Sequence, residues 1–526
     1  FCRTIPAWMV FGTPSVLVAL SYPYPQEVFL LMVVVSSVMV FTNGLYMVFF
    51  CPFVLARMQE AMSGQDLKLS LLEPDARAEE AEVVHWVVLP NYEEDVEVLA
   101  GSLESIAQSA IARRQICVLL AMEAREHEAQ NKALALKARF TGRFRQVVAT
   151  FHPPDLPNDP PGKASNMAWA FRWLDGHVME DASRVLLTVA DADSDFHRLY
   201  FQGLTRQFIE TEPHRRGLTL WQSPIFHVKN YHRQPMALIV GTMFTSMAEI
   251  AVLSDPNAIR FPYSTYSLSL QLARHVGGWD AEWIAEDWHM GIKCFLLTLG
   301  RSEVRPVLLP TVNYMPEENS WVGTLRARWS QAKRHALGFS DMSYYFMMLP
   351  LLYCRLSALA GKEGSPGLQD FWRTFFMGIA YIVRLVNTHV VVGIMTLYMI
   401  ISFFLKNLMY FALQDFRHIG QFFDRSTAAC GVFFGASLIS IAMTTISFQV
   451  VYGNLKDRME PASATWQRLF SYRFVHWAYT FGACILFAAV YCSGLATAVW
   501  IAAIKVLISA SFEYEVAAKP TKDAHL

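Results

Sequence analysis

Apolar positions gather toward the two ends of the chain, and a block of mixed polarity lies between them. Near the start, Val28–Leu55 contains no charged residue and exceeds the roughly 20 residues that a helix needs to cross a bilayer. Trp8–Leu20, which precedes it, is apolar as well. Near the end, Phe371–Leu405 is long enough for at least one span, Ala428–Val451 for another and Val475–Ile508 for two short ones. This pattern predicts about six membrane-crossing helices.

Basic residues indicate which side of the membrane the middle block faces. Arg57 follows the second apolar segment, and Lys68 and Arg77 continue the positive stretch. Because positively charged loops stay in the cytosol, we expect the block after residue 57 to be cytosolic. Tyr344–Leu359 is apolar but is interrupted by a proline and an arginine, which is typical of a helix that lies on the membrane surface. The sequence therefore predicts a multi-pass integral membrane protein, without distinguishing the plasma membrane from the Golgi.

These features divide the chain into five regions. Polar residues inside the later apolar region (Arg384, Asn387 and His389) would be costly in lipid, so we expect them to face a polar channel or the headgroup layer. Because the chain begins at Phe1 rather than at a methionine, we expect its natural N-terminus to lie upstream. The regions are N-terminal transmembrane helices over 1–57, an α/β domain over 82–340, an interfacial helix region over 341–370, a C-terminal transmembrane region over 371–512 and a polar tail over 513–526.

The middle block alternates between predicted strands and helices. Val83–Leu89 is a short apolar run that ends at Pro90, and Ile116–Ala121 and Val185–Ala190 are similar runs. Asp95 is placed to cap a helix whose apolar residues recur at helical spacing. This alternation predicts a mostly parallel sheet, with ligands bound at the carboxyl ends of its strands.

Composition narrows the function further. Hydrophobic residues make up 53% of the chain, which is high for a soluble enzyme, and the formal net charge of −1 gives no global field that would favour nucleic acid as a partner. The eight cysteines show no CxxC and no pairing pattern, so we expect reduced thiols or small apolar residues within the membrane.

The run Val185–Ala190 opens onto Asp191 and Asp193. Side chains alternate along an extended segment, so both carboxylates should point the same way. Two such oxygen ligands suit Mg²⁺ or Mn²⁺, which can then bridge the phosphates of a substrate. The alternative is a solvated acidic turn, but the position at the end of a buried strand favours a metal site.

Glu286 and Asp287 follow a Gly277-Gly278 turn that we expect to be flexible and to present a loop to a cleft. A carboxylate beside a cleft can act as a general base that deprotonates an acceptor hydroxyl. The alternative is that both residues are acidic caps at the start of a helix.

The third candidate is the basic stretch 326–335. Gln331, Arg334 and His335 share one face at helical spacing, and Arg334 could bind a leaving diphosphate through paired hydrogen bonds. A juxtamembrane helix in contact with lipid headgroups explains the basic residues equally well. Earlier in the chain, Gly162-Lys163 could place a cation against phosphate, although the segment is not a P-loop.

Taken together, these elements resemble the membrane-embedded family-2 glycosyltransferases, the group that contains cellulose, chitin and hyaluronan synthases. The resemblance covers residues 85–340 and, in outline, the flanking spans. The matching elements, in the order of the family, are Leu89-Pro90-Asn91-Tyr92-Glu93, Lys163 with Asn166, the Asp191/Asp193 pair, Gln222-Ser223-Pro224, Gly277-Gly278, Glu286-Asp287 and Gln331-x-x-Arg334.

The resemblance implies a GT-A fold and inversion at the anomeric carbon of a nucleotide-sugar, with a UDP-sugar favoured. It implies that Asp191 and Asp193 contact the metal and diphosphate, and that Asp287, beside Glu286, activates the acceptor. Pro90, Tyr92 and Glu93 would lie by the nucleotide base, Lys163 near uracil or phosphate, Gln331 and Arg334 near the diphosphate, and Trp288 and His335 toward the acceptor.

The chain departs from the family pattern in three places. Met122-Glu123-Ala124 stands where the family has Asp-Asp-Gly, so Glu123 is expected to replace an aspartate beside the nucleotide. His335 replaces the tryptophan that closes the family's Gln-x-x-Arg-Trp, which removes an indole on which an acceptor sugar could stack. No copy of the synthases' gating-loop motifs follows residue 340. The last two departures weaken the case for a processive polymerase but leave sugar transfer intact.

Three function classes therefore compete. The first is a glycosyltransferase that either extends a polysaccharide, with export through the membrane, or transfers single sugars to a glycan or lipid-linked acceptor. The second is a transporter or channel, against which the large α/β block with ordered carboxylates argues. The third is a catalytically silent scaffold, against which the joint presence of Asp191, Asp193 and Asp287 argues.

Overall fold

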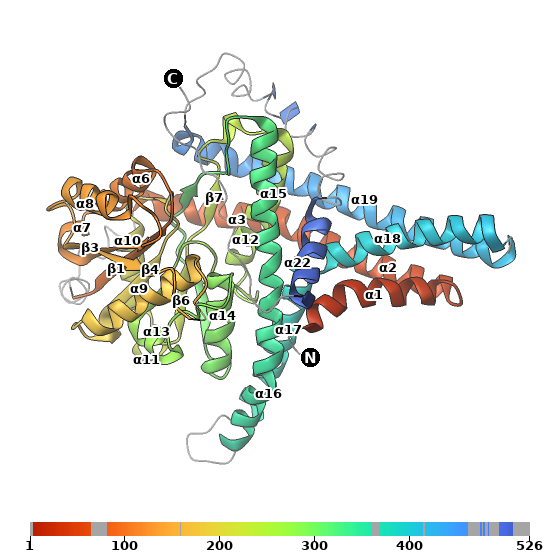
Figure 1. Ribbon diagram of the computed structural model, residues 1–526, viewed down its shortest axis with the longest axis horizontal. Helices are drawn as coiled ribbons and strands as arrows, with labels where there is room; N and C mark the ends of the chain where they lie inside the picture. The colour runs from red at the N-terminus through yellow and green to blue at the C-terminus, as the bar shows by residue number, and fades with distance from the viewer. Residues whose placement is uncertain are drawn as a thin grey trace.

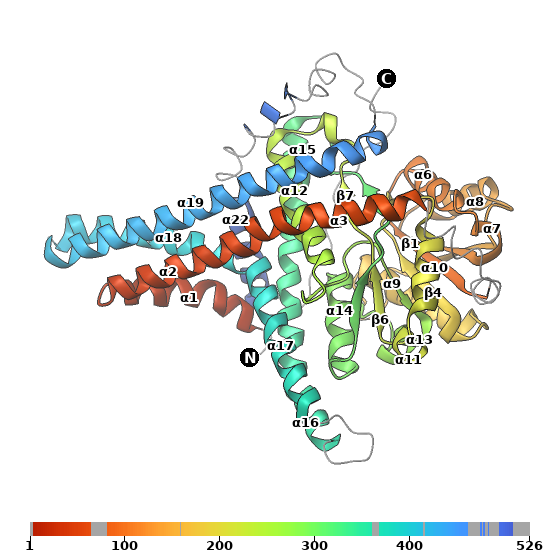
Figure 2. The same ribbon diagram turned by 180° about the vertical axis from the view of Figure 1, so that it is seen from behind.

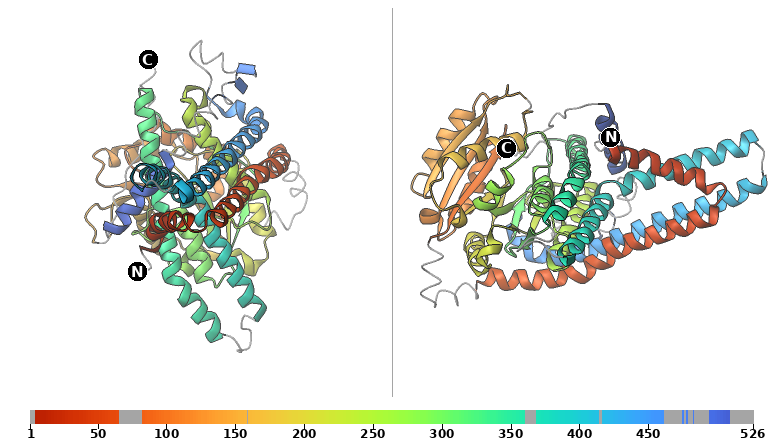
Figure 3. Two further views of the ribbon diagram at one scale, coloured as in Figure 1. Left: turned by 90° about the vertical axis from the view of Figure 1, so that its right-hand side faces the viewer. Right: turned by 90° about the horizontal axis from the view of Figure 1, so that it is seen from below.

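The computed structural model describes residues 4–64, 82–157, 159–359, 368–413, 416–460 and 494–508, together with isolated positions between 474 and 482. The predicted polar tail over 513–526 and the basic residues Lys68 and Arg77 lie outside this part of the chain. Within it, a sheet domain occupies one end of the molecule and a long helical arm the other (Figures 1 and 3).

The main sheet has the strand order β3-β2-β1-β4-β8-β6-β9, and only β8 runs antiparallel to its neighbours. The prediction of a mostly parallel sheet is therefore confirmed. A smaller sheet has the order β5-β10-β7. The strands are β1 Val84–Asn91, β2 Ile116–Glu123, β3 Gln146–His152, β4 Val185–Val189, β5 Asp195–Phe196, β6 Thr219–Gln222, β7 Ile225–His227, β8 Tyr266–Ser269, β9 Glu303–Pro306 and β10 Thr311–Asn313.

Helices cover both faces of the main sheet, so its central strands β1, β2, β4 and β8 are buried at every position and are mostly apolar. Val87 of β1 packs into the core beneath one face, and its neighbour Val88 packs into the core beneath the other. Asp95 caps the helix that follows β1, as predicted, by accepting a hydrogen bond from the Glu97 amide. The helices on the first face are α6 Val96–Ala107, α8 Ala129–Arg139 and α10 Tyr200–Glu210, and those on the second are α9 Lys163–His177, α13 Leu270–Val276 and α14 Glu286–Leu297.

The arm consists of helices from both ends of the chain, and α19 lies along α2 and α3 (Figure 2). Among the described residues, two helices are long and apolar enough to cross a membrane, Val391–Ala412 and Asp424–Gly453, where about six were expected. The arm contains α1 Ile5–Ser21, α2 Pro25–Val40, α3 Tyr46–Ser63, α18 Val391–Leu408, α19 Phe416–Leu455 and α22 Ala496–Ile508.

One apolar helix lies where the sequence suggested mixed polarity. Helix α12, Met236–Ser254, packs between the sheet domain and the arm, with Met243 and Met247 in a core shared with α3 and α19. The expected concentration of apolar segments toward the chain ends did not include this helix. Its buried position explains its composition, since a core helix and a membrane span carry the same apolar signal.

Three more helices stand between the sheet domain and the arm: α15 Trp321–Leu337, α16 Asp341–Leu359 and α17 Leu368–His389 (Figure 1). The predicted apolar segment 371–405 is broken at Val390 into α17 and α18. Only the second part qualifies as a candidate span. Helix α17 packs one side against the core, where Tyr381 and Leu385 are buried.

Candidate active site

A cavity of 1280 Å³ opens at the carboxyl ends of β1 and β4 and continues between α2, α12, α15 and α17. It collects side chains from segments that are far apart in the sequence. The predicted site residues that line it are Pro90, Tyr92, Glu123, Lys163, Asp191, Asp193, Glu286, Asp287, Trp288, Gln331, Arg334 and His335.

Asp191 and Asp193 follow β4 and are held from the opposite side by the end of β10. Tyr314 N–H donates to Asp193 Oδ2 at 2.9 Å, and Asn313 Nδ2 lies 3.4 Å from Asp191 Oδ2. Sequence reasoning missed Asn313 and Tyr314, because nothing in their local sequence marks them and only the pairing of β10 with β5 brings them near.

The donor set here fits a divalent cation that takes part of its coordination from a substrate. Asp191 and Asp193 offer hard carboxylate oxygens on one cavity wall, which Mg²⁺ and Mn²⁺ prefer. Among the described residues no three His, Cys, Asp or Glu side chains converge on one point. Phosphate oxygens and water would therefore have to complete the coordination shell.

Lys163, the first residue of α9, joins the two acidic pairs. Its Nζ lies 2.7 Å from Asp191 Oδ1 and 2.6 Å from Glu286 Oε1. Burial alone would lower the pKa of Lys163, but Asp191, Glu286 and Asp287 together raise it well above its usual range. Burial also raises the pKa of Glu286, to about 7, with Asp287 contributing. Lys163 is therefore a permanent positive charge between the pairs.

Asp287 is the more accessible of the two adjacent carboxylates. Glu286 is only 6% exposed, whereas Asp287 is half-buried and faces the cavity. Ser264 N–H donates to Asp287 Oδ2 at 2.8 Å, and Ser264 itself adopts a φ of 49° in a tight turn. Such a backbone conformation is costly for a residue other than glycine, and here it aims an amide at the carboxylate. Sequence reasoning missed Ser264, because its surroundings carry no motif.

At the far end of the cavity, Tyr92 meets an arginine that sequence reasoning missed. The guanidinium carbon of Arg125 lies 3.7 Å from the centre of the Tyr92 ring, and its Nε lies 3.3 Å from Glu123. Glu123 is buried and also approaches His152 Nδ1 at 3.3 Å. The structure thus places Arg125 between Glu123 and Tyr92.

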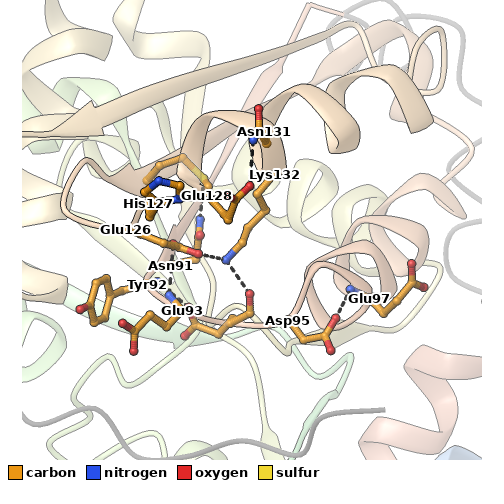
Figure 4. Close-up of polar contacts among 12 residues, drawn as sticks. Asn91, Tyr92, Glu93, Asp95, Glu97, Glu126, His127, Glu128, Asn131 and Lys132 are labelled. Carbon is orange, nitrogen blue, oxygen red and sulfur yellow. Dashed lines mark hydrogen bonds and ion pairs between the residues drawn. The ribbon is translucent and has the colours of Figure 1, made fainter. Parts of the chain in front are cut away.

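The loop after β1 is fastened by a lysine and two glutamates (Figure 4). Lys132 pairs with Glu126 and donates to the Glu94 carbonyl at 2.7 Å. Glu93 is exposed at a φ of 62°, and its N–H donates to Glu126 Oε2 at 3.2 Å. Glu93 does not line the cavity, whereas its neighbour Glu94 does.

The predicted basic helix is confirmed as α15, capped by Ser320, whose Oγ accepts from the Gly323 amide at 3.0 Å. Arg328 donates to Gln331. Burial, with Arg334 contributing, lowers the pKa of Arg328 to about 10. Gln331, Arg334 and His335 all line the cavity, as their shared helical face predicts.

The Gly277-Gly278 turn ends α13 tightly and differs from the expected loose loop. Gly278 N–H bonds to the Ala273 carbonyl, and a Cβ on Gly278 would lie 2.1 Å from Phe171. Lys293 Nζ donates to the Gly278 carbonyl at 2.9 Å. The turn is thus a fixed support for α14, on which Glu286 and Asp287 form the first turn.

Comparisons with solved structures give weak similarities. They include the mannosyltransferase PcManGT from Pyrobaculum calidifontis in complex with GDP-Man and Mn²⁺ (13% identity, 84% of this chain and 98% of that one, TM-score 0.34). Another is glucosyl-3-phosphoglycerate synthase from Mycobacterium tuberculosis with UDP (17% identity, 48% and 82%, TM-score 0.28). A third is residues 1–349 of TarS from S. aureus (11% identity, 72% and 88%, TM-score 0.31). These scores are too low to support an argument.

The family comparison is more informative. No curated protein matches this chain. The family model for glycosyl transferase family group 2 matches residues 186–414, a range that includes both acidic pairs, the Gln331/Arg334 face of α15, and α17. The comparison therefore supports a glycosyltransferase, in which residues 186–414 are similar to glycosyl transferase family group 2.

Proposed function

We propose that the chain catalyses the inverting, metal-dependent transfer of a sugar from a nucleotide-sugar, with a UDP-sugar favoured, to a hydroxyl group of an acceptor. The observation that carries this proposal is the bridge of Lys163 between Asp191 and Glu286, which brings both acidic pairs to one cavity. Asp191 and Asp193 can bind the metal that holds the diphosphate, and Asp287, beside Glu286, can accept the proton of the acceptor.

The chemistry assigns a different task to each group. The acceptor oxygen bonds to the anomeric carbon, the bond from that carbon to the diphosphate breaks, and the acceptor proton passes to Asp287. A base opposite the leaving group produces inversion. Asp191 and Asp193 would hold Mg²⁺ or Mn²⁺, which when bound supplies positive charge to the departing diphosphate. Lys163 and Arg334 line the same cavity and supply further positive charge.

The opposite end of the cavity suits the nucleotide. Tyr92 and Arg125 offer a flat stacked pair beside Pro90, on which a base can lie. Glu123 holds Arg125 in that position. We propose that Glu123 acts through Arg125, and that Glu93 contributes through its backbone, since its side chain is exposed.

We further propose that the arm is embedded in a membrane, with the sheet domain in the cytosol. The two candidate spans, and the exposed apolar side chains of α1, α2 and α18, support this arrangement. Polysaccharide extension with export and transfer of single sugars use the same chemistry, so the size of the product separates them. His335 in place of a tryptophan favours single transfer.

The test uses full-length protein in nanodiscs. A panel of UDP- and GDP-sugars is supplied with Mn²⁺ or Mg²⁺, nucleoside diphosphate release is followed, and radiolabelled product is sized. We expect metal-dependent release with at least one donor. A high-molecular-weight product would identify a polymerase and a short product single transfer, whereas the absence of release with every donor would contradict the proposed function.

A further inference from the structure

We propose that the acceptor is a lipid, with its hydroxyl head group at Asp287 and its hydrocarbon chain in an apolar groove between α2, α12 and α17. The groove is defined by Val34, Val38, Phe244, Phe376, Ile379 and Val383. This inference rests on the proposed function and names the class of its acceptor.

The groove and the candidate base belong to one cavity. Asp287 and Trp288 line that cavity together with the groove residues. A molecule that presents a hydroxyl to Asp287 and extends away from the diphosphate site therefore enters the groove.

The walls of the groove are apolar side chains that the protein does not cover. Phe376, Ile379 and Val383 recur at helical spacing on α17 and are 62%, 42% and 60% exposed. On helix α2, which lines the same cavity, Val34 and Val38 are 58% and 53% exposed. The opposite side of α17 carries the buried Tyr381 and Leu385. Helix α17 thus has one apolar face for the core and a second that is open to an apolar occupant.

The cavity combines charged and apolar walls, as an amphiphile requires. The ion pair between Arg384 and Glu249, at 2.8 Å, lines it together with Asp287, and the Arg384 guanidinium carbon lies 5.8 Å from the ring of Trp288. The residues that define the groove are all apolar, although Asn387 and Thr388 of α17 also line the cavity. A glycan would need hydroxyl partners and stacking rings along its whole length, whereas a hydrocarbon chain needs only apolar walls.

The same arrangement accounts for a polar residue in an apolar segment. Arg384 was expected to face a channel or the headgroup layer, and it lines this cavity while paired with Glu249. The pair marks the boundary between the head group and the chain of the acceptor.

The experiment uses full-length protein in nanodiscs with the donor and metal that support nucleoside diphosphate release. The acceptors are 1-O-alkylglycerols with alkyl chains of increasing length and, in parallel, water-soluble cello-oligosaccharides. We expect glycosylated alkylglycerol, with a kcat/KM that rises about three- to four-fold for each methylene that the groove buries. Val383→Asn and Ile379→Asn should flatten that dependence. Ile439→Asn, a change of an equally exposed residue on α19 that does not line the cavity, should preserve it.

Two results would overturn the inference while leaving the proposed function standing. The first is transfer only to the soluble oligosaccharides. The second is the same dependence on chain length in Val383→Asn, Ile379→Asn and the wild type, which would assign the apolar faces to contact with the bilayer. No nucleoside diphosphate release with any donor would instead contradict the proposed function itself.

Discussion

Glu286 and Asp287 are adjacent in the sequence but differ in burial and in partners. Glu286 points at Lys163 and is nearly closed off from solvent, whereas Asp287 faces the cavity and accepts the Ser264 amide. Glu286 is buried beside Lys163, and we expect it to hold that lysine in place.

The substitution Asp287→Asn should separate donor binding from transfer. The asparagine side chain oxygen can still accept the Ser264 amide, so the fold and donor affinity should change by no more than about twofold. The base is lost, so kcat should fall about 10²- to 10⁴-fold. Calorimetry of donor binding tests the expected affinity, and the rate of nucleoside diphosphate release tests the expected loss of kcat. Full activity in this variant would refute the assignment of Asp287 as the base.

Asp193→Ala should weaken nucleotide-sugar binding only when metal is present. The substitution removes one expected metal ligand, and the affinity should fall at least about tenfold. Asp195→Ala is the matched control, because Asp195 pairs with Arg458 and does not line the cavity. Donor titrations with Mn²⁺ and with EDTA make the comparison. If both substitutions weakened donor binding equally, Asp193 would not be a metal ligand.

At the scale of elements, the glycine turn before α14 makes a stability prediction. Gly277 and Gly278 both have a positive φ, but only at Gly278 would a Cβ collide with Phe171. Gly277→Ala should lower the free energy of unfolding by about 1 kcal/mol through backbone strain. Gly278→Ala should lower it clearly more, because the Phe171 ring must also move. Chemical denaturation of both variants measures the difference. Equal losses of unfolding free energy in the two variants would mean that the clash with Phe171 does not affect stability.

His289 connects α14 to the start of α16 and makes that connection sensitive to pH. Its Nε2 lies 2.9 Å from Asp280 and its Nδ1 3.3 Å from Asp341, with Lys293 beside Asp280 at 2.7 Å. Burial opposes the charge on His289, but the two carboxylates raise its pKa above the usual 6.5. Its stabilisation is therefore complete below pH 6.5 and is lost as the pH rises through the raised value.

We accordingly expect the melting temperature of the wild type to fall as the pH is raised from about 6.5 toward 9. The variant His289→Gln should be less stable at low pH and should show a flatter dependence over this range. Thermal unfolding followed at several pH values tests this. A parallel decline in both proteins would show that His289 does not carry the effect.

The elements differ in how far local sequence could predict them. Runs such as Ile116–Ala121 predicted strands because fully buried parallel strands need apolar residues on both faces, and β2 only extends that run to Glu123. Helix α12 was missed because hydropathy does not separate a buried core helix from a membrane span. The insertion of the antiparallel β8 beside β4 depends on tertiary pairing that no local pattern records.

The candidate site shows the same limit. Asp191 and Asp193 were predicted from their position at the end of a buried strand, and Glu286 and Asp287 from the glycine turn before them. The structure places both pairs in one cavity. Asn313, Arg125 and Ser264 were not predicted, because each lies at a strand end or in a loop whose approach depends on the order of strands in the sheets.

At the scale of the whole molecule, the end of the arm is tied to segments that lie next to Asp191 and Asp193. Arg458, which follows α19, pairs with Asp195 at 3.0 Å and donates to the Pro310 carbonyl. Tyr314, whose amide holds Asp193, also bonds through its hydroxyl to Glu460. The sheet domain and the arm therefore meet at the site, and the cavity needs both.

The measurement that tests the account most directly is the anomeric configuration of the product, followed by NMR during turnover of a donor whose sugar is α-linked. A single displacement, with Asp287 as the only base and the diphosphate held on the opposite side, predicts a β-linked product throughout the reaction. An α-linked initial product would contradict the account, because retention requires chemistry other than one base acting opposite the leaving group.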